Sequence, residues 1–174
     1  MPTTRPSHPA SPRRRQRDRR GAAAVEFALV SVLLFPLLLG IIQYGLFFND
    51  SINTRQGIRE AARQGVVRSF PACGGASTDM DKLKCNAKVQ VGALAGTVYV
   101  KAWYPTGGWV KGNPLKVCAA VKNTAPGMLP MPNGGWTRSQ ATMAVEQDAT
   151  PLPTGSTTED SLPSGQNWIW CTQP

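Results

Sequence analysis

The chain has 174 residues, of which 19 are Lys or Arg and 10 are Asp or Glu. This length supports roughly one domain of about 100 to 150 residues, which excludes a large multidomain enzyme. Of the formal net charge of +9, the first 20 residues supply +6, because they contain seven Arg and one Asp.

Residues 1–21 are predicted to form a basic, disordered leader. They combine arginines with several prolines and contain no Phe, Trp or Tyr, a composition that cannot bury enough apolar surface to fold. A basic tail can bind nucleic acid, but a surface that does so usually interleaves aromatic residues with the cations. We therefore expect no nucleic-acid partner, and we attribute the charges to retention of the N-terminus beside anionic lipid.

Residues 22–48 are predicted to cross a membrane as a helix. The segment has 27 residues and few polar interruptions. A helix of that length reaches about 40 Å, and roughly 20 apolar residues suffice to cross the hydrocarbon. One small domain could not cover a helix that is apolar all round, so a buried core helix is the weaker interpretation. The run is also longer than that of a cleavable secretory signal and ends without a small-x-small site.

The distribution of arginines predicts the orientation of this helix. Seven Arg precede it, and none lies between Arg20 and Arg55. The positive-inside rule therefore puts the N-terminus in the cytoplasm and the C-terminal part outside, with membrane lipid as a partner.

Glu26 lies about one turn inside the apolar run. An ionised side chain costs a few kcal/mol near the centre of a bilayer and less near its edge, so such a charge usually has a partner. Glu26 could snorkel to the cytoplasmic headgroups or meet Arg20. Alternatively, it could pair with a cation on another chain.

Three segments carry a resemblance to a known family. Residues 19–27 read RRGAAAVEF, with Gly21 directly after the basic leader and Glu26 and Phe27 opening the apolar helix. This string resembles the prepilin-peptidase site of type IV pilin-like proteins, and most closely that of the TadE-like proteins of the Flp (tight adherence) pilus system. The sequences GIIQYG at 40–45 and IREAARQG at 58–65 resemble the second half of the long helix in that family.

The resemblance implies a processing site and an assembly site. A prepilin peptidase would cut between Gly21 and Ala22, which leaves Glu26 as the fifth residue of the mature chain. The new α-amino group at Ala22 could then pair with the Glu26 carboxylate of a neighbouring chain in a low-dielectric bundle. Glu26 and Phe27 are therefore the expected subunit-assembly residues.

Residues 49–69 are predicted to extend the helix into water as an amphipathic segment. At 100° per residue, one stripe of small residues opposes one stripe of cations. The first consists of Gly57, Ala61 and Gly65, and the second of Arg55, Arg59 and Arg63. The small residues allow close approach of the chain's own outer domain, which we favour, or of another subunit's helix. We assign no chemistry to the arginines.

Residues 70–148 are predicted to form an extracytoplasmic α+β domain. A capping box at Thr78 to Asp81 starts a short helix that we expect to end at Gly96. Alternation of apolar residues predicts antiparallel strands over 97–104, 115–122 and 140–146. Residues 149–174 form a Pro/Ser/Thr-rich tail with a further strand over 167–171, or else a flexible linker. The fold class is thus α+β, with a long N-terminal helix before a small helix and an antiparallel sheet, as in pilin-like proteins.

The four cysteines are predicted to form two disulfides. Cys73, Cys85, Cys118 and Cys171 all lie on the expected outer side of the membrane. They include no Cys-x-x-Cys and the sole His is His8 in the leader, so we expect no metal site. Three connectivities are possible. We favour Cys73 with Cys85, which flank the start of a helix, and Cys118 with Cys171, which would tie the tail to the sheet.

No enzyme is expected, and we name no catalytic residue or cofactor. The outer segment has no His, no Gly-x-Ser-x-Gly element, no phosphate loop and no dinucleotide fingerprint. The resemblance implies a minor pilin or pseudopilin, a structural subunit for assembling a Flp/Tad-type adhesive or secretion pilus. Its partners would be a prepilin peptidase, other pilin subunits and the assembly machinery, and its place the bacterial inner membrane or a surface filament. The alternative is an unprocessed single-pass anchor that carries an extracytoplasmic binding domain.

Overall fold

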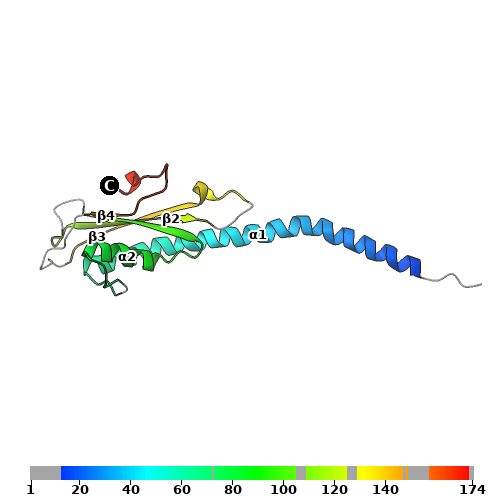
Figure 1. Ribbon diagram of the computed structural model, residues 1–174, viewed down its shortest axis with the longest axis horizontal. Helices are drawn as coiled ribbons and strands as arrows, with labels where there is room; N and C mark the ends of the chain where they lie inside the picture. Colours follow the sequence, from blue (N-terminus) through cyan, green and yellow to red (C-terminus); the bar gives the residue numbers. More distant parts are fainter. Residues whose placement is uncertain are drawn as a thin grey trace, which may run out of the picture.

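The computed structural model describes residues 13–71, 73–104, 109–124, 129–146, 148 and 157–172 (Figure 1). The elements in chain order are α1 (Arg13–Val66), α2 (Asp79–Val91), β1 (Gly96–Trp103), β2 (Pro114–Asn123), η1 (Pro132–Gly135), β3 (Trp136–Ala144), β4 (Thr157–Glu159) and α3 (Ile169–Thr172). Figure 1 shows α1 as a long rod: its C-terminal half lies along the other elements, and its N-terminal half projects away from them.

The four strands form one antiparallel sheet in the order β3-β2-β1-β4. α1 contacts β2 and β3, and α2 contacts α1 and β1, so the two helices cover one face of the sheet. α3, drawn in red, lies on the opposite face (Figure 1). A long helix, a short helix and an antiparallel sheet confirm the predicted α+β class.

The main core lies between the two helices and the sheet. The alternate apolar side chains of β2 are fully buried there: Leu115, Val117, Ala119 and Val121. A second, smaller cluster on the other face joins Cys118 and Ala120 to Trp168 and Cys171. Because β2 is central, its alternate residues serve two cores, and both of its faces are buried.

α1 begins earlier than the sequence predicted. Its first residue is Arg13, so residues 13–21, which were expected to be disordered, are helical. Arg and Gln have good helix propensity, and the last proline of the leader, Pro12, directly precedes the helix. Residues 1–12 lie outside the described part of the chain. α1 continues through Pro36 and ends at Val66, two residues before Arg68, which adopts a left-handed conformation with φ of 57°.

α2 has the predicted start and a different end. The Thr78 hydroxyl accepts a 3.1 Å hydrogen bond from the Asp81 backbone N–H, which confirms the cap. The helix ends at Gly92, not at Gly96, because Gly92 takes a left-handed conformation with φ of 49°. Leu94, within the expected span of this helix, therefore lies beyond its end and is 73% exposed.

The C-terminal segment contains a strand, but not at the predicted position. The fourth strand is β4, at the free edge of β1, where Glu159 forms an ion pair with Lys101 at 2.7 Å. A strand was expected over 167–171, but residues 169–172 form the short helix α3. The Asn167 side chain accepts a 3.2 Å hydrogen bond from the Ile169 backbone N–H, and this local bond starts the helical turn.

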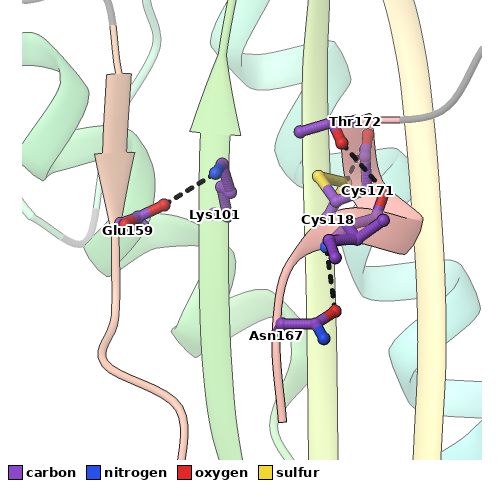
Figure 2. Close-up of a disulfide and its surroundings, with 7 residues drawn as sticks. Lys101, Cys118, Glu159, Asn167, Cys171 and Thr172 are labelled. Carbon is purple, nitrogen blue, oxygen red and sulfur yellow. Dashed lines mark hydrogen bonds and ion pairs between the residues drawn. A yellow bond between two sulfur atoms is a disulfide. The ribbon is translucent and has the colours of Figure 1, made fainter.

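The structure has two disulfides, with the favoured connectivity. Cys73 is bonded to Cys85 beside the start of α2, and Cys118 of β2 is bonded to Cys171 of α3. Figure 2 shows the second bond holding α3 against the outer face of the sheet. The C-terminal segment is thus fixed by a covalent link to the central strand.

Candidate membrane and assembly site

The projecting half of α1 has the properties of a membrane-spanning helix. Among the described residues, one helix, Gly21–Val66, is long and apolar enough to cross a membrane. The side chains from 21 to 39 are exposed, apart from the half-buried Ser31. Because an exposed apolar helix of this length is unfavourable in water, the surface requires lipid or another protein.

The predicted processing and assembly residues all lie on this projecting half. A Cβ atom built on Gly21 would meet no other atom within 4 Å, and Ala22 is exposed. Gly21 is about 28 Å along the helix axis from Gly40, where the outer domain first covers α1. The domain therefore leaves this segment open to other proteins.

Glu26 is exposed among apolar neighbours. No described side chain forms a hydrogen bond or an ion pair with its carboxylate. Phe27 beside it is 68% exposed, and Val30 is 55% exposed. A carboxylate in this setting requires a partner once the helix is in a low-dielectric environment.

The outer domain reaches α1 first through the segment that follows β2. Leu129 covers Gly40 so closely that a Cβ on Gly40 would lie 2.9 Å from Leu129 Cδ1. Gln43, 4% exposed, donates a 2.6 Å hydrogen bond to the Leu129 carbonyl and accepts one of 3.3 Å from the Leu129 N–H. The Tyr44 hydroxyl donates to the Pro130 carbonyl at 2.8 Å.

A buried carboxylate makes the next contact. Asp50 is 1% exposed and accepts hydrogen bonds from the backbone N–H groups of Leu94 and Ala95, at 2.8 and 3.2 Å. The side-chain amide of Asn123 donates a third, at 3.2 Å. Asp50 thereby joins α1 to the start of β1 and the end of β2.

The stripe of small residues packs on the chain's own domain, as we favoured. Gly57 faces α2, and Gly65 faces Leu83 and Leu115. Ala61, between them, is fully buried. The three arginines of the opposite stripe are exposed, and Arg63 forms an ion pair with Glu60 at 2.7 Å. The small-residue side of the amphipathic segment is therefore covered by the chain's own domain, and the arginine side is exposed.

The comparison with protein families covers this same helix. Residues 21–65 match the TadE-like protein family. The resemblance stated from the sequence is thus confirmed, and it extends from the predicted processing site to the end of the small-residue stripe. No curated protein and no solved structure matches the chain.

The TadE-like match indicates a protein associated with the Tad pilus. TadE-like proteins are structural and are not known as enzymes. Within the part of the chain that the structure describes, no three His, Cys, Asp or Glu side chains are grouped to hold a metal ion. The matched segment lies entirely on α1 and includes no residue of the sheet.

Sequence reasoning missed the roles of Gln43 and Asp50. Both lie on the face of α1 that the domain covers, and a helical spacing connects them to the small residues that we had singled out. The buried positions run Gly40, Gln43, Phe47, Asp50, Thr54 and Gly57. Extending the stripe backward from Gly57 at intervals of three and four residues would have found them.

Proposed function

We propose that the protein is a minor pilin or pseudopilin, a non-catalytic subunit used in the assembly of a Flp/Tad-type pilus. The observation that carries the proposal is the family match that begins at Gly21. Gly21 lies on the half of α1 that projects from the domain with its side chains exposed (Figure 1). In this proposal the N-terminus is cytoplasmic and the outer domain is extracytoplasmic. A prepilin peptidase and other pilin subunits are the partners.

Processing at Gly21 changes the charge at the membrane surface. Cleavage before Ala22 removes a leader with seven Arg and creates one α-amino group. The mature chain then begins directly with its apolar helix, without the arginines that retain the precursor beside anionic lipid. Processing therefore turns a retained precursor into a subunit that can leave its initial position.

Glu26 supplies the pairing that orders the subunits. Its exposed carboxylate has no described partner in its own chain, and the new amine of a neighbouring chain is a cation of the right charge. Inside a bundle of apolar helices, an unpaired charge is costly and a paired one is tolerated. The pairing would fix how far one subunit's helix is shifted along its axis relative to the next. Apolar side chains alone do not define this shift.

The test is to sequence the N-terminus of the membrane-extracted protein, from cells with and without a prepilin peptidase. We expect a mature chain that begins at Ala22 only when the peptidase is present. The matched variants are Gly21→Leu, which should block processing, and Gly45→Leu, which alters an open glycine far from the site and should not. An intact leader in cells that process other prepilins contradicts the proposal.

One observation favours the alternative of an unprocessed anchor. α1 runs without interruption from Arg13 through Gly21, so the leader can remain as the cytoplasmic end of a single continuous helix. In that case the outer domain would bind an envelope component without polymerising. The same N-terminal sequencing separates the two functions, since the anchor retains its leader.

A further inference from the structure

The segment Leu129–Met131, between β2 and η1, lies beside the apolar part of α1 and carries only apolar side chains. Leu129 is 43% exposed although it contacts Gly40, and Pro130 is exposed. Counted from Ala22, Gly40 is about 27 Å along the helix, close to the roughly 30 Å thickness of a hydrocarbon core. The segment therefore meets α1 at the depth where the outer edge of the hydrocarbon is expected.

The polar backbone groups of Leu129 and Pro130 are hydrogen-bonded within the protein, as a site without water requires. Leu129 and Pro130 together present three polar backbone groups, because Pro has no N–H. All three are paired with α1: Gln43 binds both groups of Leu129, and Tyr44 binds the carbonyl of Pro130. Non-helical backbone is tolerated at membrane depth only when its polar groups are satisfied by protein.

The residues at the adjoining ends of β2 and β3 have the character of residues in the headgroup region. Lys122, at the end of β2, is opposite Trp136, at the start of β3, with its ammonium 5.6 Å from the centre of the indole ring. Tyr44 lies beside the segment on α1. Aromatic rings with nearby cations are enriched at membrane–water interfaces.

We infer that Leu129, Pro130 and Met131 enter the outer leaflet of the bilayer, so that the domain has a second contact with lipid beside α1. The partner is phospholipid: acyl chains around Leu129 and headgroups near Lys122 and Trp136. This inference rests on the proposed membrane-spanning role of α1. A groove lined by Pro36, Leu37, Gly40, Ile41, Tyr44 and Leu129 continues the same apolar surface between the loop and the helix.

The test places an environment-sensitive fluorophore at defined positions in the full chain, reconstituted in phospholipid vesicles with or without lipids that carry a quencher on the acyl chain. Leu129→Cys and, separately, Met131→Cys are labelled after both native disulfides have formed. Val110→Cys is the matched control, because Val110 is 45% exposed and lies at the opposite end of the domain, before β2. Leu33→Cys reports insertion of α1.

We expect the labels at Leu129 and Met131 to emit at shorter wavelength than the label at Val110 and to be quenched, more strongly by a shallow quencher than by a deep one. Gln43→Ala, which leaves both polar groups of Leu129 unpaired, should reduce quenching at Met131. If Leu33 is quenched while Leu129 and Met131 behave like Val110, the inference is wrong and the membrane helix stands. If Leu33 is also unquenched, both are wrong.

Discussion

Gly57 of α1 lies so close to Gln90 of α2 that a Cβ atom on Gly57 would be 2.4 Å from the Gln90 carbonyl oxygen. The Val91 Cα would be 2.6 Å away. Both of these atoms belong to backbone, which cannot rotate aside as a side-chain end can. This contact sets the distance between the two helices.

Gly57→Ala is therefore expected to destabilise the protein by about 2 kcal/mol, because the helices must separate to admit one methyl group. The matched control is Gly45→Ala, where the added Cβ meets nothing within 4 Å. That change should be neutral or stabilising by up to about 1 kcal/mol. Thermal unfolding of the full chain in detergent micelles measures both. Equal effects of the two substitutions would contradict the close packing.

Asp50→Ala is expected to destabilise the protein by about 3 kcal/mol, since it leaves the N–H groups of Leu94 and Ala95 without their acceptor. Asp50→Asn should cost less, because the amide oxygen can still accept one of these bonds. Glu146→Ala is the control, as Glu146 is an exposed acid. The same unfolding measurement applies, and a loss at Asp50 no larger than at Glu146 would rule out the anchoring role.

Removal of the Cys118–Cys171 disulfide is expected to cost more stability than removal of Cys73–Cys85. The sequence separations are 53 and 12 residues, and the chain-entropy model gives about 4 and about 3 kcal/mol. Paired Cys→Ala variants measure this by thermal unfolding. The variant without Cys118–Cys171 should also become sensitive to protease at residues 157–172, and the variant without Cys73–Cys85 should not. Reversal of that order would show that chain entropy does not dominate.

The ion pair at the start of α2 predicts a loss of stability in acid. Burial raises the pKa of Asp79, but hydrogen bonds and charge from Arg68 and Lys82 outweigh it, so the net pKa is lowered. A carboxyl with a lowered pKa in the folded state stabilises above its unfolded pKa of about 3.9 and loses this as pH falls through the folded value. The melting temperature should therefore fall below about pH 4.

Asp79→Asn is the comparison for this pH effect. It should be less stable than the parent at neutral pH, and the difference between the two should shrink as the pH is lowered below about 4. Melting temperatures over this range measure it. A difference independent of pH would show that the carboxylate charge contributes nothing.

Glu26→Ala is expected to leave membrane insertion intact and to abolish co-assembly with pilin subunits. The substitution removes a charge from an apolar surface, so insertion becomes easier, while the partner for a neighbouring α-amino group is lost. Glu26→Gln separates charge from size. Carbonate extraction measures insertion, and copurification with sheared filaments measures assembly. Normal assembly of Glu26→Ala would refute its role.

The parts of the fold that could be predicted depend on local pattern. The cap at Thr78 uses a bond to a residue three positions away, and the alternation in β2 reflects the two faces of one strand. The small stripe at Gly57, Ala61 and Gly65 follows from helical periodicity. In each case the physical cause lies within a few residues, so the sequence contains it.

The parts that could not be predicted depend on distant partners. Gln43 binds Leu129, 86 residues away, and Asp50 binds Leu94, 44 residues away. The helical turn at α3 has four residues, too few for a periodic signal, and the disulfide to Cys118 holds it. The roles of Gln43 and Asp50 emerge only when the tertiary fold brings these groups together.

The seating of the domain along one side of α1, from Gly40 to Val66, means that the helix and the domain rotate about the helix axis together. If a neighbouring helix packs on one side of α1, the direction in which the domain points around the helix axis is set as well. Moving that contact by one residue along α1 would turn the domain by about 100°. In the proposed assembly, contacts between helices within the lipid would therefore set which edge of the sheet points outward.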